Sequence, residues 1–114
     1  MRKTNIKFGN KVYKVNIPQR VTKLDETHLS ILQKIYEAND KGVTISKAML
    51  TGRKSKFSGK TTVFSWKCRL DMDEIINSNP KLFQKGRYGS RGGWGWKFVP
   101  TPLQEILAED IKQD

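Results

Sequence analysis

The spacing of the apolar residues changes near residue 25, and this change does most to limit the folds open to the chain. From Ile6 to Ile17 apolar and polar residues alternate, which predicts strands with one buried face. From Leu29 to Tyr36 apolar residues instead recur every three or four positions, which predicts a helix. We therefore expect N-terminal antiparallel β-strands within residues 5–24, including a short extended piece at 21–24, followed by helices.

Capping residues and glycines divide residues 25–79 into three predicted helices. Asp25 or Thr27 can cap the first helix, and Thr44 can cap a second, shorter helix that Gly52 ends. Residues 53–60 are basic and serine-rich, and we expect them to form a loop. The third helix is expected to start between residues 58 and 62 and to end by 77–80. Its buried stripe would consist of Val63, Trp66 and Leu70.

The last part of the chain predicts a hairpin and a further helix. A strand is expected from residue 82, then a glycine-rich loop over 84–93 and a returning strand on which Trp94, Trp96 and Phe98 alternate. All three tryptophans, Trp66 included, are most simply core residues. Residues 101–104 (Thr-Pro-Leu-Gln) are typical of a helix start. The apolar stripe of this terminal helix would consist of Leu103, Ile106, Leu107 and Ile111.

Charge is the most informative part of the composition. The chain carries a formal net charge of +11 over 114 residues. The last fourteen residues hold four acidic residues and one basic residue, so residues 1–100 carry +14. Two stretches, 41–69 and 81–97, contain eight and five basic residues and no acidic one. A balance this basic indicates a polyanionic partner, either nucleic acid or an anionic membrane surface.

Other features indicate the compartment. A single cysteine, Cys68, excludes an internal disulfide framework and suits a reducing environment. No apolar run approaches the ~18 residues of a membrane span, and the N-terminus lacks the apolar core of a signal peptide. The length suits one domain. We expect a cytoplasmic protein that is not inserted in a membrane.

Motifs that would indicate an enzyme are weak. Residues 59–61 (Gly-Lys-Thr) resemble the end of a phosphate-binding loop, but six residues instead of four separate Gly52 from Gly59. The acidic cluster at 71–74 has no second carboxylate cluster to complete a two-metal site and is expected to be a solvated surface. His28 is expected on a helix face, without an obvious nucleophile or ligand partner. We therefore expect no catalytic residues, no metal and no cofactor.

Strands, three helices and a hairpin are the element order of a winged-helix domain. In detail the chain resembles the DNA-binding effector domain of OmpR/PhoB-type response regulators, without a receiver domain. Residues 24–32 (LDETHLSIL) look like that family's strand-to-helix signature, 63–70 (VFSWKCRL) are similar to its recognition helix, and 93–98 (GWGWKF) look like the end of its wing. Asp25 and His28 replace the usual Thr and Glu of the first signature, and Phe64 and Ser65 replace a common base-reading pair.

The resemblance implies an α+β fold, a winged helix-turn-helix over residues 1–100. It would comprise N-terminal strands (5–24), three helices (25–79) and a wing hairpin (81–100), with an additional acidic amphipathic helix at 101–114. The implied function is sequence-specific binding of double-stranded DNA by a transcription regulator, with the third helix in the major groove and the wing against the minor groove.

The residues that would contact DNA under this resemblance are polar or basic and lie around the third helix and the wing. They are Arg53, Lys54, Lys56, Lys60, Thr61, Thr62, Ser65, Lys67, Arg69, Lys85, Arg87 and Arg91. Within this set Arg87 and Arg91 would probe the minor groove. Segment 53–60 corresponds to the part of such activators that contacts RNA polymerase, and the terminal helix is a candidate for homodimer formation. The expected location is the nucleoid, or the host cytoplasm if the source is a phage or virus.

Two alternatives remain open. An RNA or single-strand binder would use the RGG-like segment 87–93 and exposed tryptophans as stacking platforms. A polymerase-docking adaptor protein would use the acidic terminal helix. A nuclease is the least favoured reading.

Overall fold

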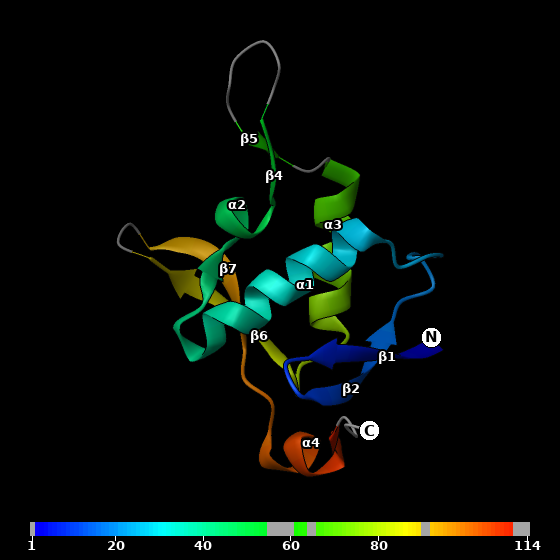
Figure 1. The fold of residues 1–114 in the computed structure, drawn as a ribbon. Coiled ribbons are helices and arrows are strands. Elements are labelled where there is room, and N and C mark those ends of the chain that lie inside the picture. The colour runs from blue at the N-terminus through cyan, green and yellow to red at the C-terminus, as the bar shows by residue number, and fades with distance from the viewer. Residues whose placement is uncertain (1, 55–60, 64–65, 90–91, 111–114) are drawn as a thin grey trace.

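The computed structural model describes residues 2–54, 61–63, 66–89 and 92–110, and within these ranges it has an α+β fold (Figure 1). The predicted α+β class is therefore confirmed. The described residues form three small antiparallel sheets and four α-helices. The sheets have the strand orders β1-β2-β8, β3-β7-β6 and β4-β5.

The N-terminal strands follow the predicted alternation. Strands β1 (Arg2–Phe8) and β2 (Lys11–Ile17) pair in register from Arg2↔Ile17 to Phe8↔Lys11. The turn between them uses Gly9 at φ +62°, a backbone conformation that glycine adopts without strain. The alternating apolar side chains point into the core as expected. Residues 21–24, predicted to be extended, form no strand.

Helix α1 (Glu26–Ala38) begins at Asp25, one of the two predicted caps. The Asp25 carboxylate accepts a hydrogen bond from the His28 backbone N–H at 3.0 Å, and His28 Nδ1 accepts one from the Asp25 N–H at 3.2 Å. These reciprocal bonds form a capping box in which histidine takes the place of the usual Glu or Gln. The predicted apolar face is buried, and Ile31, Leu32 and Ile35 are fully enclosed.

The middle of the chain departs from the sequence prediction. After the short helical turn η1 (Asn39–Lys41) and strand β3 (Val43–Thr44), helix α2 (Ile45–Ala48) is capped by Thr44 as predicted but ends before Gly52. Strand β4 (Leu50–Lys54) then pairs with β5 (Thr61–Val63), and the pair projects away from the rest of the fold (Figure 1).

The predicted start of the third helix is therefore wrong. Helix α3 spans Trp66–Asn77, and residues 61–63 precede it as a strand. The reason is that Thr61, Thr62 and Val63 are all β-branched, which disfavours helix and favours a paired strand once β4 offers backbone partners. The prediction that residues 53–60 form a loop is likewise wrong for Arg53 and Lys54, which belong to β4.

The predicted buried stripe of this helix is also out of phase. Leu70 is only partly buried, whereas Cys68, Met72, Ile75 and Ile76 form the buried face. The side chains of Val63 and Trp66 lie outside the described part of the chain, so their place in the core stays a prediction. The buried face follows the apolar repeat of Cys68, Met72, Ile75 and Ile76, which recur every three or four positions.

The second hairpin is longer than predicted. Strands β6 (Phe83–Tyr88) and β7 (Gly93–Phe98) pair without interruption from Phe83↔Phe98 to Tyr88↔Gly93. Residues 84–88, predicted as loop, are thus strand, and the turn begins at Gly89 with φ +80°. Pairing with β7 gives each side chain of β6 a defined face despite the glycines in the segment.

A cluster of aromatic rings joins this hairpin to the N-terminal sheet and α1. The Phe98 ring is the centre of the cluster, with ring centroids of Phe8, Tyr13, Tyr36 and Phe83 at 5.2, 5.3, 5.4 and 5.5 Å. Such tilted and edge-to-face contacts add to the stabilisation from apolar burial. The core therefore connects elements from both ends of the chain.

The terminal segment is less helical than predicted. Helix α4 (Pro102–Leu107) is capped by Thr101 as expected, but strand β8 (Glu109–Asp110) follows it and pairs with β2. The predicted helix over 101–114 is therefore wrong for residues 108–110, and residues 111–114, Ile111 included, lie outside the described residues. Leu103, Ile106 and Leu107 are largely exposed, so the apolar stripe is not covered by the described part of the chain.

Candidate nucleic-acid interface

Four of the twelve predicted contact residues lie on α3 and on the β6–β7 hairpin. Lys67 and Arg69 are in the N-terminal part of α3, and Lys85 and Arg87 are on β6. Lys67, Lys85 and Arg87 are exposed, and Arg69 is partly buried. The fold brings these two regions together, because Lys85 Nζ lies 3.5 Å from an Asp73 carboxylate oxygen on α3.

Four more predicted contact residues lie on β4 and β5. The sequence places Thr61 and Thr62 on the recognition helix, but both are on β5, so that placement is wrong. Arg53 and Lys54 are on β4. The remaining predicted contacts lie outside the described residues: Lys56, Lys60, Ser65 and Arg91.

One face of the β6–β7 hairpin carries two cations beside an exposed indole. Arg87 and Trp94 are directly opposite in the strand register and therefore share a face. The Arg87 guanidinium lies 4.9 Å from the centroid of the Trp94 ring, and Lys85 Nζ lies 5.8 Å from it. Both distances are within the range of cation–π attraction.

Trp94 corrects the prediction that all three tryptophans are core residues. Trp96 is fully buried, but Trp94 is 52% exposed. The two side chains are on the same face of β7, yet Trp94 is closer to the turn. Strand alternation therefore predicts the face of Trp94 but not its burial.

A groove lies between the hairpin, the start of α2 and α3. It has a volume of about 570 Å³, and its lining includes Thr44, Ser46, Arg69, Tyr88 and Trp94. No acidic side chain lines it among the described residues. The groove therefore combines hydroxyl groups, a guanidinium and two aromatic rings, a set that can donate hydrogen bonds to phosphate and stack on bases.

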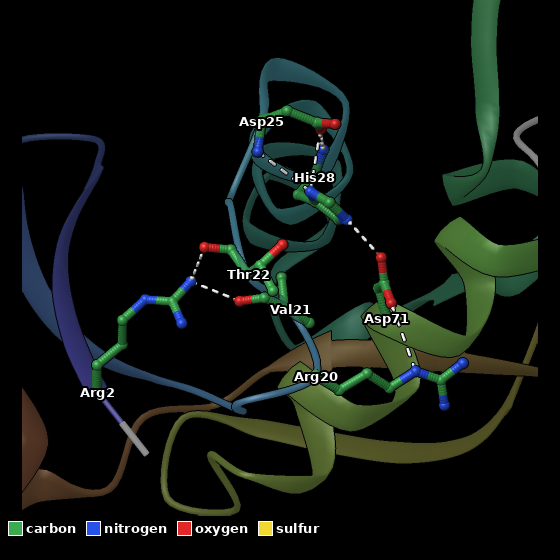
Figure 2. Close-up of polar contacts among 7 residues, drawn as sticks. All are labelled: Arg2, Arg20, Val21, Thr22, Asp25, His28 and Asp71. Carbon is green, nitrogen blue, oxygen red and sulfur yellow. Dashed lines mark hydrogen bonds and ion pairs between the residues drawn. The ribbon is translucent and has the colours of Figure 1, made fainter.

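Between α1 and α3 lies a buried polar network that the sequence did not predict (Figure 2). Asp71, expected on a solvated surface, and His28, expected on a helix face, are each 5% exposed. His28 Nε2 lies 3.1 Å from an Asp71 carboxylate oxygen, and Arg20 Nε lies 3.8 Å from the other oxygen. Because Nδ1 accepts from the Asp25 N–H, a neutral imidazole with its proton on Nε2 satisfies both bonds. The network fixes α3 against the start of α1.

Cys68 lies next to this network, and its thiol has a raised pKa. Burial raises the pKa of its thiol to about 11, and the nearby Asp25 and Asp71 carboxylates add to the shift. The thiol is therefore protonated at neutral pH. Because only the thiolate is a strong nucleophile, Cys68 is expected to react slowly. In the described part of the chain, no group of three or more His, Cys, Asp or Glu side chains is arranged to hold a metal ion.

Comparisons with known proteins add no relative: no protein-family model, curated protein or solved structure matches the chain. Among the described residues, no helix has the length and apolar character needed to cross a bilayer.

Proposed function

We propose that this chain is a sequence-specific double-stranded DNA-binding regulator of transcription with a winged-helix architecture. In this proposal α3 is the recognition helix in the major groove, and the β6–β7 hairpin is the wing against the minor groove. The proposal requires no chemistry, because binding energy alone carries the regulatory effect.

The groove between α2, α3 and the hairpin is the observation that carries the proposal. It brings Arg69 from α3 into the same hollow as Tyr88 and Trp94 of the hairpin, although these residues are separated by about twenty positions in the sequence. Lys67 and Arg87 are exposed on the same two elements. Surfaces that bind duplex DNA combine cations for the phosphates with polar groups that reach the bases.

The net charge supports the same partner. Residues 1–100 carry +14, and the acid-free stretches 41–69 and 81–97 supply the elements around the groove. An anionic membrane surface would also attract this charge, but nucleic acid additionally suits a concave site with hydroxyl groups and aromatic rings. Docking of RNA polymerase at segment 53–60 and homodimer formation through α4 stay predictions.

Titration with DNA and RNA at two salt concentrations tests the proposal. We expect duplex DNA to bind more tightly than structured RNA or a single strand, and its affinity to fall steeply with salt. Replacement of Arg87 by Ala should lower the salt slope by about one, since one phosphate or groove contact is lost. Lys14→Ala, at an exposed position of β2, is the control and should leave the slope unchanged. Equal or tighter binding to RNA would refute the proposal.

A further inference from the structure

We propose that Trp94 is a stacking platform for an unpaired nucleobase, so that the hairpin recognises DNA in which at least one base has left the duplex stack. This inference rests on the proposed DNA-binding function and narrows its ligand. The shared chemistry is an exposed base, whether it comes from a bulge in a duplex or from a single strand.

The exposure of Trp94 is the first step of the argument. Its indole is 52% exposed, whereas Trp96 two residues later on the same face is fully buried. When another flat apolar group covers a large apolar ring that is exposed to water, the free energy of the system falls.

The two cations decide which kind of group covers the ring. Arg87 and Lys85 lie 4.9 and 5.8 Å from the ring centroid, and Lys85 is also held by Asp73 of α3 at 3.5 Å. These contacts place positive charge beside the ring. A nucleotide suits this arrangement, because it joins a flat base to a phosphate that the cations can neutralise.

The contact between Arg87 and the Trp94 ring favours stacking of one base on the ring over insertion of the ring between two base pairs. A side chain that wedges between two base pairs needs both faces of its apolar group. The Arg87 guanidinium already covers part of the Trp94 ring, so a single base on the open part is the better fit. That base would lie at the edge of the groove lined by Tyr88 and Arg69, whose volume of about 570 Å³ is ample for one nucleoside.

Fluorescence anisotropy with three labelled DNAs of equal length tests the inference: a perfect duplex, the same duplex with a one-nucleotide bulge, and one strand alone. We expect the bulged duplex to bind more tightly than the perfect duplex. Trp94→Leu should weaken binding to the bulged duplex about tenfold while changing perfect-duplex affinity less than twofold, and Trp94→Phe should keep most of the preference. Ile106→Ala, at an exposed apolar position of α4, is the matched control.

A direct readout comes from 2-aminopurine placed at the bulge. Saturating wild-type protein should quench its fluorescence by stacking, and Trp94→Leu at saturation should not. Equal binding of the bulged and perfect duplexes, or a Trp94→Leu loss of the same size on both, would overturn the stacking role while leaving the proposed DNA-binding function intact. Failure of the wild-type protein to bind any of the three DNAs would overturn both. Tighter binding of the single strand than of the bulged duplex would assign the base to a fully single-stranded ligand and refute the duplex proposal alone.

Discussion

Replacement of His28 by Ala removes the donor that the buried Asp71 carboxylate depends on, and we expect a large loss of stability. The Asp71 side chain is 8% exposed, and His28 Nε2 lies 3.1 Å from it. Loss of the hydrogen-bond donor to a buried carboxylate costs about 1.5–3 kcal/mol, because the charged group is left without that bond. Arg20 Nε remains 3.8 Å from the carboxylate and limits the loss, so we expect about 2 kcal/mol.

A double-mutant cycle separates this pairing from other losses. His28 also accepts a bond from the Asp25 N–H, so part of the effect of His28→Ala, about 0.5–1 kcal/mol, belongs to the helix cap. Asp71→Ala removes the buried charge itself. The double variant should therefore be less destabilised than the sum of the two single variants, with a coupling of about 1.5 kcal/mol.

Urea denaturation followed by circular dichroism measures these effects through the midpoint and slope. We expect His28→Ala to lower the melting temperature by about 10 °C as well, given the size of the chain. Leu29→Ala changes the adjacent, 40% exposed residue of the same helix and serves as the control, with little change expected. A loss below 0.5 kcal/mol for His28→Ala, or strict additivity with Asp71→Ala, would refute the view that this buried pair holds α3 against α1.

Four further predictions concern packing, thiol reactivity and the pH dependence of stability. Phe98→Ala should lower the free energy of unfolding by about 3–5 kcal/mol in urea, because its buried ring contacts four other aromatic rings; a loss under 1 kcal/mol would mean that the cluster repacks. Gly95→Ala should destabilise by about 2 kcal/mol or more, because its Cβ would lie 2.1 Å from the Val43 carbonyl oxygen, whereas Gly93→Ala meets only the Thr44 methyl at 3.6 Å and should be tolerated. Equal thermal stability of these two glycine variants would contradict the close approach of β3 to β7. Cys68 should react with a disulfide reagent at pH 8 about 100-fold more slowly in the folded than in the unfolded protein, since a rise in pKa from 9.0 to about 11 lowers the thiolate fraction by that factor. Comparable reaction rates in the two states would show that the thiol is accessible. The same shift predicts that the contribution of Cys68 to the free energy of unfolding is constant below pH 9. This contribution falls as the pH rises from 9 to 11, because the folded state holds the proton more tightly.

Local patterns were sufficient where a residue's neighbours in sequence are also its structural partners. The alternation from Ile6 to Ile17 produces β1 and β2, since the turn at Gly9 joins two adjacent strands. Asp25, Thr44 and Thr101 each cap the helix that follows, because a cap bonds to an N–H only three residues away. These features depend on short-range geometry, and the sequence predicts them correctly.

Contacts between distant residues decided the features that the sequence analysis missed. Thr61 and Val63 form a strand because β4 supplies the backbone partners, a pairing that residue spacing does not contain. His28 and Asp71 are 43 positions apart, and neither residue's local pattern indicates that they share a buried bond. A partial signal was present, since a histidine at the third position of a helix suits a capping box, but its second nitrogen finds a partner only in the folded chain.

The candidate interface shows the same division. The sequence alone determined that the protein is α+β, strongly basic and equipped with a hairpin that carries Arg87 and Trp94. Only the tertiary structure decided that Trp94 is exposed while Trp96 is buried, and that Arg69 of α3 faces the same groove. The physical reason is that periodicity assigns a side chain to a face of its own strand or helix, whereas burial depends on which other elements extend far enough to cover that face.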